Sequence, residues 1–338
     1  MDIYIFWFAL MGILLTGYAI LDGFDLGVGI LHPLARSDEE RRLVMNSIGP
    51  LWDGNEVWLV TFGGALFAAF PIAYAAAFSG FYLAFMLLLF ALIFRAVSLE
   101  FRSKREHVRW RGFWDWAFFA ASFLASFLFG VAVGNAVQGV PLGPEQQFVG
   151  GIVDLLTPYP ILVGVLVVAT FAMHGAIYLY LKTEGALQER IHGWMWRTFG
   201  FFLIAYILTT IFTLVLVPHA TVNFRDIPLA WTVVVLNVLA VANVPRAIYR
   251  GKAFAAFLSS AAAIAALSFL FGMAIFPNML VSSIDPAYNL TIYNAASSET
   301  TLGIMRLIAF LGMPFVLAYT IVIYWVFRGK VKLGAHSY

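Results

Sequence analysis

The sequence alternates between long apolar runs and short polar connections. A helix needs roughly 20 predominantly apolar residues to cross a membrane, and runs of this length recur along the whole chain. We predict nine membrane-spanning helices, over about residues 4–32, 50–70, 73–101, 114–138, 159–182, 195–217, 228–249, 252–277 and 302–327. The pattern therefore predicts an all-α polytopic membrane protein in which residues 1–338 form a single integral membrane domain.

Lys and Arg residues lie almost entirely in alternate connections between these runs. All of them fall on one predicted side of the membrane except Arg95 and Arg306, which lie inside helices, and Arg225, which lies on the other side. Because cytoplasmic loops carry an excess of Lys and Arg, we expect the N-terminus outside and the C-terminus in the cytoplasm. Adding or removing one span would destroy this alternation, so the charges also support the count of nine.

The composition agrees with a membrane protein and excludes several kinds of site. The chain is 62% hydrophobic and 11% charged, whereas a soluble domain carries about 25% charged residues. The absence of cysteine excludes disulfides, thiol catalysis and thiolate metal sites. The first apolar run is too long for a cleaved signal peptide and has no basic start, so we expect the first helix to remain in the mature protein.

The first predicted helix carries two acids close to its cytoplasmic end. Asp22 and Asp25 are three residues apart and therefore share a helical face. Charged groups inside a membrane are costly and usually mark ion or proton paths, although pairing with a nearby Arg would explain both acids equally well. Gly23 and Gly27 are four residues apart, a spacing that lets another helix approach closely.

The second predicted helix begins with a similar group of polar residues. Asp53 lies in its first turn, where the helix dipole favours a carboxylate, and Glu56 lies one turn deeper with Asn55 beside it. We interpret this stretch as a cytoplasmic mouth for protons. The alternative is a helix-dipole partner next to an interfacial tryptophan, Trp52.

The third predicted helix ends with Arg95 and Glu100. We expect Arg95 to pair with one of the acids above, and Glu100 to pair with Lys104 four residues later. We interpret Asp115 as the helix-start acid of the fourth helix, within a belt of aromatic residues. The predicted proton path comprises Asp22, Asp25, Asp53 and Glu56, supported by Trp52, Asn55, Arg95 and Glu100.

The histidines indicate that no haem is ligated by this chain. A six-coordinate membrane haem needs two axial ligands on facing helices, and only His174 lies inside a predicted span. We interpret His174 as a packed or proton-linked residue. The other histidines are predicted at the inner surface, at a helix end or in the tail: His32, His107, His192, His219 and His336. No zinc or dimetal spacing is present, so we expect no metal ligands here and any redox cofactor in another chain.

Two long stretches, Leu21–Gly29 and Asn46–Leu59, closely resemble subunit II of cytochrome bd-type quinol oxidases. The same resemblance extends to residues 63–71, 75–82, 101–104 and 134–141. It is dense over residues 18–141 and looser beyond. Two positions depart from the family pattern: Leu51 precedes the tryptophan where some members have a polar residue, and Glu56 replaces a common glutamine. The first departure affects the hydration of the predicted cytoplasmic mouth. The second adds an acid to it whose charge state the sequence does not assign.

The resemblance implies two four-helix bundles plus one peripheral helix. The first bundle would comprise about residues 4–138, and the remaining helices about 159–249 and 252–327. It also implies a large partner, subunit I, that carries two b haems, haem d and the quinol site, while the small subunit ligates no haem. In this family, the acid of the Trp-Asp-Gly-Asn motif is proposed to lie on a cytoplasmic proton path to haem d. The corresponding residue here is Asp53.

We therefore expect subunit II of a terminal oxidase in a bacterial cytoplasmic (inner) membrane, inactive alone and without a nucleic-acid partner. The complex would couple quinol oxidation to reduction of O2 to water, taking protons from the cytoplasm without pumping. The identity of the quinone, a structural quinone in this chain and a small single-helix subunit are left open. One rival is a proton-coupled transporter, which should place its site at broken helices near the midplane; another is a purely structural membrane subunit.

Overall fold

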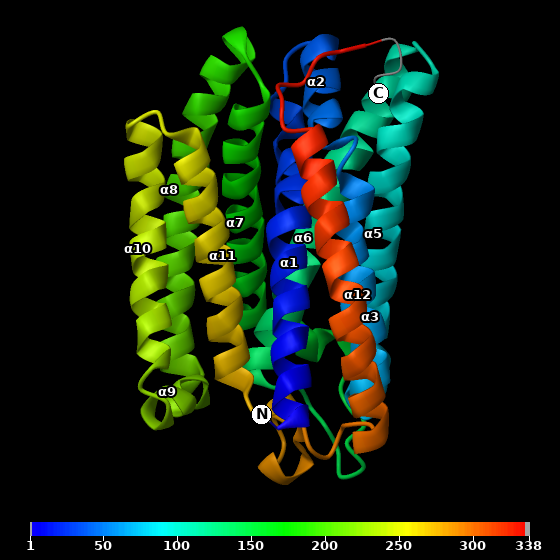
Figure 1. Cartoon of the computed structure of the whole chain (residues 1–338), viewed down its shortest axis with the longest axis vertical. Helices are drawn as coiled ribbons and strands as arrows, with labels where there is room; N and C mark the ends of the chain where they lie inside the picture. Colours follow the sequence, from blue (N-terminus) through cyan, green and yellow to red (C-terminus); the bar gives the residue numbers. More distant parts are fainter. Residues whose placement is uncertain (1, 335–338) are drawn as a thin grey trace.

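The computed structural model describes residues 2–334, most of which lie in long helices that run side by side (Figure 1). The long helices are α1 (Ile3–Leu31), α3 (Trp52–Ala69), α5 (Tyr82–Phe101), α6 (Val108–Gln138), α7 (Pro158–Lys182), α8 (Gly185–Leu216), α10 (Ala230–Tyr249), α11 (Ala253–Ile275) and α12 (Glu299–Val326). Shorter elements are the helices α2 (Asp38–Ile48), α4 (Pro71–Gly80) and α9 (Val222–Asp226), five 3₁₀ turns, and an antiparallel pair of strands, β1 (Asn278–Leu280) and β2 (Leu290–Thr291).

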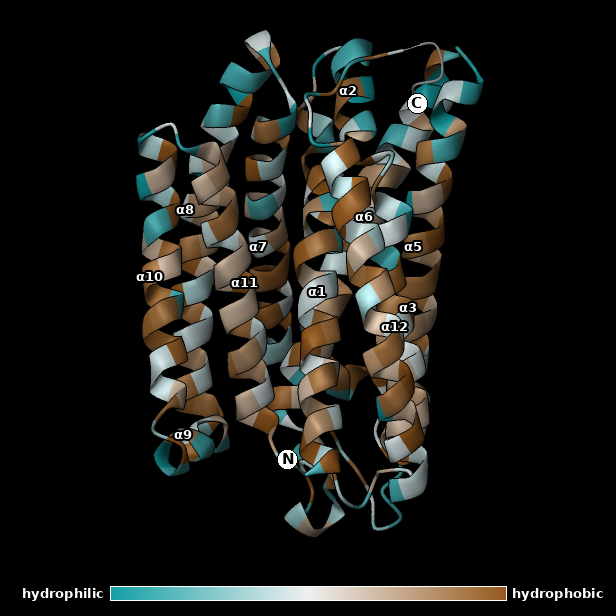
Figure 2. Cartoon of the chain, in the orientation of Figure 1, coloured by the Kyte–Doolittle hydropathy of each residue, from teal (hydrophilic) through white to brown (hydrophobic). Residues whose placement is uncertain are grey.

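Eight of the described helices are long and apolar enough to cross a membrane. α3 and α4 meet this criterion only as a pair, and a bend of 119° separates them, so the count rises to nine when the bent pair is included. Apolar residues fill the middle of the helices and hydrophilic residues gather at their ends (Figure 2). The prediction of an all-α polytopic membrane protein is thus confirmed, and the predicted nine spans agree with the upper count.

Several helix boundaries differ from the prediction. The expected span 73–101 is interrupted at Phe81, which separates α4 from α5. α8 begins at Gly185 rather than near residue 195, and α6 begins at Val108 rather than at residue 114. Hydropathy locates the apolar part of a helix, whereas backbone hydrogen bonds continue into polar residues at its ends. The predicted start of each of these two helices therefore lies too far along the chain.

Nearly all Lys and Arg residues lie at one end of the molecule, which we call the basic end. It contains α2, the α5–α6 and α7–α8 connections, the α10–α11 turn and the C-terminal segment (Figure 1). α2 was not predicted. Its N-cap is Ser37, whose hydroxyl accepts a hydrogen bond from the amide of Glu40 at 3.2 Å, and its first turn is acidic, as the helix dipole favours.

The opposite end is closed by the two longest loops, residues 139–157 and 276–298. They join through backbone hydrogen bonds: Val140 donates to Val281 and Ser283 donates back to Val140, both at 2.9 Å. β1 and β2 belong to the second of these loops. This end therefore forms a compact cap rather than a set of independent loops.

α7 is the most enclosed helix and α12 the least. In their most apolar stretches, 78% of the residues of α7 and none of those of α12 are buried. α1 packs against α3, α6, α7 and α11, and thereby joins the two groups of helices visible in Figure 1, α7, α8, α10 and α11 on one side and α3, α5, α6 and α12 on the other. The polar residues predicted on α1 consequently lie at the centre of the molecule.

Candidate functional site

Arg95 of α5 holds together two of the predicted acids. Its guanidinium is fully buried, and Nη1 donates to Asp22 Oδ1 of α1 at 2.7 Å. Nη2 donates to a carboxylate oxygen of Glu56 on α3. The expected pairing of Arg95 with these acids is therefore present, and it ties three helices together.

A second set of contacts surrounds Asp25, one turn along α1 from Asp22. Asn55 of α3 donates through Nδ2 to Asp25 Oδ2 at 2.7 Å and to the carbonyl oxygen of Leu21 at 3.3 Å. The hydroxyl of Tyr324 on α12 donates to Asn55 Oδ1 at 2.9 Å. We call Asp22, Asp25, Asn55, Glu56 and Arg95 the membrane acid cluster.

The membrane acid cluster contains polar atoms whose bonding capacity is unused. Asp22 Oδ2, Asp25 Oδ1 and Arg95 Nε are buried without a hydrogen-bond partner in the part of the chain that the structure describes, as is the hydroxyl of Tyr18 beside the cluster. Most buried polar groups in proteins are paired. Moreover, the cluster holds three carboxyl groups and one guanidinium, which contacts only Asp22 and Glu56, and an excess of buried negative charge is costly. The cluster is therefore suited to binding protons or water.

The remaining predicted residues lie closer to the surface. Asp53, in the first turn of α3, is exposed, and its carboxylate has no hydrogen-bond or ion-pair partner within residues 2–334. Trp52 is half-buried and packs against the main apolar core. Glu100, in the last turn of α5, is exposed at the basic end. Asp53 thus lies apart from the buried acids Asp22 and Asp25, although the sequence analysis grouped them in one predicted proton path.

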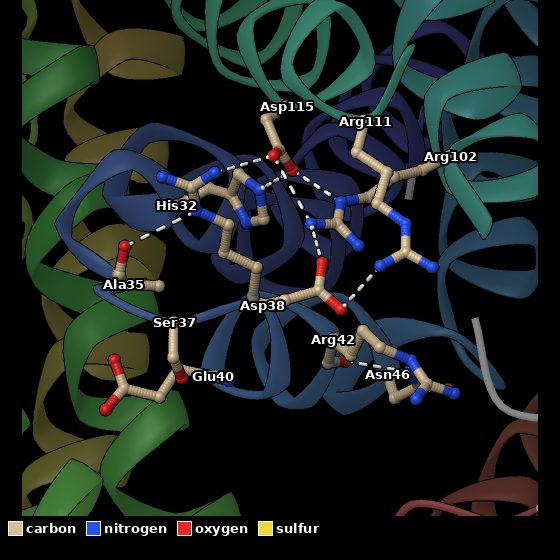
Figure 3. A network of polar contacts seen from close by, with 11 residues as sticks. His32, Ala35, Ser37, Asp38, Glu40, Arg42, Asn46, Arg102, Arg111 and Asp115 are labelled. Atoms are coloured by element: carbon tan, nitrogen blue, oxygen red, sulfur yellow. Dashed lines mark hydrogen bonds and ion pairs between the residues drawn. The ribbon is translucent and has the colours of Figure 1, made fainter. Parts of the chain in front are cut away.

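A second polar network, which the sequence did not predict, lies at the basic end and is centred on Asp115 (Figure 3). Asp115 Oδ1 accepts from His32 Nε2 at 2.7 Å and from Arg102 Nε at 2.5 Å. Asp115 Oδ2 accepts from Arg41 Nη1 at 2.9 Å. Asp38 of α2 extends the network, because it accepts from Arg102 at 2.8 Å and from Arg111 at 3.0 Å.

Two interpretations from the sequence are corrected by this network. Asp115 is not a helix-start acid: α6 begins at Val108, so Asp115 lies about two turns inside it and is 8% exposed. His32 is not at the inner surface but fully buried. The partners of Asp115 come from three segments outside α6, so no local spacing could have revealed them. The nearest signal was the concentration of Arg residues in the connections around it.

The ring of His174 is held between two neighbouring helices. His174 Nε2 donates to the carbonyl oxygen of Ile20 at 3.1 Å, and Nδ1 lies 2.7 Å from Ser260 Oγ. Both ring nitrogens are thus engaged by α1 and α11. Among the described residues, no group of three or more His, Asp or Glu side chains could hold a metal ion. His336 lies outside the described residues.

Comparison with known proteins identifies the family to which this chain belongs. Residues 3–327 match the sequence model of the family described as "Cytochrome bd terminal oxidase subunit II". The chain is 38% identical to cytochrome bd-I ubiquinol oxidase subunit 2 of Escherichia coli (strain K12), covering 96% of this chain and 94% of that protein. It is 35% identical to cytochrome bd ubiquinol oxidase subunit 2 of Bacillus subtilis (strain 168), with 96% of each chain covered. The fold resembles a chain of the solved bd oxidase from Geobacillus thermodenitrificans, with a TM-score of 0.79, 18% identity, and coverage of 97% of this chain and 99% of that one.

Proposed function

Because this chain belongs to the cytochrome bd terminal oxidase subunit II family, we propose that it is the small subunit of a complex that couples quinol oxidation to reduction of O2 to water. The complex would use cytoplasmic protons and create a membrane potential without pumping. A large subunit I would carry the two b haems and haem d. The engaged ring nitrogens of His174 support a role without haem ligation for this chain.

The charge distribution supports an orientation in a bacterial cytoplasmic membrane. With the basic end in the cytoplasm, the N-terminus of α1 and the capped end lie outside. α3 would be one span and α4 with α5 the next, which gives nine spans. We further propose two four-helix bundles, one built from α1, α3, α5 and α6 and one from α7, α8, α10 and α11, with α12 peripheral to both. The single integral membrane domain covers both bundles.

The membrane acid cluster is the observation that carries the proposed role in proton transfer. Asp53 is accessible at the basic end of α3, and Glu56 lies one turn deeper, bonded to the guanidinium of Arg95. Arg95 in turn holds Asp22, and Asp25 follows one turn along α1. Protons would enter at Asp53 and move by way of these carboxyl groups and bound water toward the haem d site of subunit I.

The exposure of Asp53 bears on where subunit I sits. A proton path between the cytoplasm and a haem must be shielded from lipid, because a charged carboxylate is costly in hydrocarbon. α3 presents Asp53 on the surface of the isolated chain. We infer that subunit I covers this part of α3 and forms the other wall of the path.

A proton-coupled transporter is less consistent with the structure. Such proteins bind substrate near the midplane at broken helices. Here the break between α3 and α4 lies next to Phe70, at the end of α3 away from Asp53 and Glu56. A purely structural membrane acid cluster remains the main rival, and mutation distinguishes it from a proton path.

The test is Asp53→Asn in the whole oxidase, expressed with its partner subunits. Asn keeps the shape of Asp but cannot relay a proton as a carboxylate does, so we expect an assembled complex with an unchanged haem spectrum. Quinol oxidase turnover should fall by about tenfold, which is less than the roughly 10²–10⁴-fold contribution of an acid or base at the reacting atoms, and it should fall further at high pH. The matched control is Asp226→Asn, an exposed acid in α9 at the opposite end.

A helix-dipole role for Asp53 gives a different outcome. Replacing such a residue by Asn costs only about 0.3–1 kcal/mol of stability, and turnover would equal that of the control. Wild-type turnover in a fully assembled Asp53→Asn complex would refute proton entry at this residue and favour the structural role.

A further inference from the structure

A cavity of about 930 Å³ opens at the basic end. Its walls come from the α2–α3 connection, the end of α5, the end of α7 and the C-terminal segment. Four lysines line it: Lys104, Lys182, Lys330 and Lys332. Glu100 is the one acid among the lining residues that the structure describes. The cavity therefore has an excess of positive charge and is suited to an anion.

Two of these lysines are held in place by the docking of the C-terminal segment on α7. Lys182 Nζ donates to the carbonyl oxygens of Phe327 and Gly329, and Lys330 Nζ donates to the carbonyl oxygen of Thr183 at 2.7 Å. The amide of Val331 donates to the carbonyl oxygen of Lys182 at 2.8 Å. These reciprocal bonds bring ammonium groups from segments far apart in sequence to one wall of the cavity.

Lys330 lies on the wall of the cavity with its ammonium partly buried. Partial burial lowers the pKa of its ammonium, and the nearby Glu184 only partly opposes that effect. Lys104 and Lys332 are exposed on the same cavity. An anionic group placed among these lysines would therefore gain favourable interactions with several cations at once.

The cavity also has an apolar wall that continues onto the exposed apolar surface of α12. Val326 and Phe327, at the end of α12, line it. Further along α12, Ile321 and Val322 are exposed, and Arg328 stacks on Trp325 with its guanidinium carbon 4.6 Å from the ring centroid. Tryptophans with adjacent basic residues are typical of the membrane–water interface. The cavity therefore lies where the polar surface of the membrane meets the hydrocarbon.

We propose that this cavity binds the headgroup of an anionic phospholipid, with its phosphate among the lysines and its acyl chains along the end of α12. Basic pockets between spanning helices on the cytoplasmic side suit such headgroups. A soluble anion would contact the lysines but not the apolar wall. A lipid would contact both, so the combination of basic and apolar lining favours a lipid. The assignment to the cytoplasmic leaflet rests on the proposed orientation, whereas the site itself does not.

The test uses the whole oxidase complex carrying the double variant Lys104→Gln/Lys332→Gln. This variant leaves intact Lys182 and Lys330, which dock the C-terminal segment. The matched control is Arg250→Gln/Lys252→Gln, which removes the same charge from the α10–α11 turn at the same end. After transfer into phosphatidylcholine nanodiscs with a small fraction of phosphatidylglycerol, native mass spectrometry counts the phosphatidylglycerol molecules that each complex retains.

Each basic residue near an anionic membrane surface contributes about fivefold to the attraction, so losing two should weaken retention by roughly 25-fold relative to the control. Phosphatidylglycerol, but not phosphatidylcholine, should raise the thermal midpoint of the wild-type complex, and the double variant should lose that shift. Equal retention in both variants would overturn the proposal. Binding of inorganic phosphate at this site, without a preference for phosphatidylglycerol over phosphatidylcholine, would also overturn it. An unchanged haem spectrum in both variants shows that assembly is intact, and neither readout depends on proton transfer.

Discussion

Gly27 of α1 and Gly175 of α7 lie backbone against backbone. A Cβ built on Gly175 would lie 2.5 Å from the carbonyl carbon of Gly27, and one built on Gly27 would lie 1.9 Å from the carbonyl oxygen of Phe171. Real Cβ atoms do not approach other atoms so closely, so both positions require glycine. The contact brings α1, which carries Asp22 and Asp25, against the most enclosed helix of the molecule.

We predict that Gly27→Ala destabilises the protein. The added methyl group would meet backbone rather than a flexible side chain, so the two helices must separate, at a cost of at least about 1–3 kcal/mol. Gly12→Ala on the same helix is the control, because a Cβ there meets no atom within 4 Å. The thermal midpoint of the assembled complex measures both, and equal midpoints would contradict the close approach of α1 and α7.

Arg95→Gln is expected to prevent normal assembly at neutral pH. It removes the guanidinium that holds Asp22 and Glu56, and uncompensated buried charges cost about 3–5 kcal/mol. The yield of complex with a normal haem spectrum reports the effect. Adding Asp22→Asn should recover part of that yield, since it removes one of the stranded charges. A normal yield from Arg95→Gln alone would show that the acids do not need this ion pair.

Asp115→Asn should destabilise the basic end more than Asp38→Asn does. Asp115 is largely buried and accepts from His32, Arg41 and Arg102, so its loss leaves several donors without a charged acceptor, at about 2–3 kcal/mol. The side chain of Asp38 is 45% exposed, and exposed pairs contribute about 1 kcal/mol or less. Thermal unfolding of the two complexes gives the order, and the reverse order would show that Asp115 is not the centre of this network.

Glu40→Gln should lower stability at pH 7 and have little effect at low pH. The hydrogen bond from Arg190, at 2.5 Å, lowers the pKa of the Glu40 carboxyl below its usual value of 4.5. A carboxyl with a lowered folded-state pKa stabilises the protein above its unfolded-state pKa, and that contribution disappears as pH falls through the folded-state pKa. For this partly exposed pair we expect about 0.5–1 kcal/mol.

The control for Glu40 is Glu39→Gln, an exposed neighbour in the same first turn of α2. Thermal midpoints of both variants are compared with wild type at pH 7 and at a pH well below 4. A Glu40 effect that is the same at both pH values would mean that the ion pair with Arg190 does not contribute.

The sequence was sufficient for the membrane class, the positions of most spans and the family. Long apolar runs can be satisfied only by helices in lipid, and the alternating Lys and Arg residues supported the number of spans. The orientation that they predict stays a prediction. Local spacing also predicted the shared face of Asp22 and Asp25 and a close helix approach at Gly27. These properties follow from a single helix, because 3.6 residues per turn determine which side chains lie together.

Only the tertiary structure decided which helices meet and how deeply each polar side chain is buried. It separated exposed Asp53 from buried Asp25, which looked alike in sequence, and it gathered His32, Arg41, Arg102 and Asp115 from four segments into one network. It also formed the lysine-lined cavity from the C-terminal segment and three other parts of the chain. Contacts between residues far apart in sequence depend on how helices pack, and the periodicity within each helix carries no information about its neighbours.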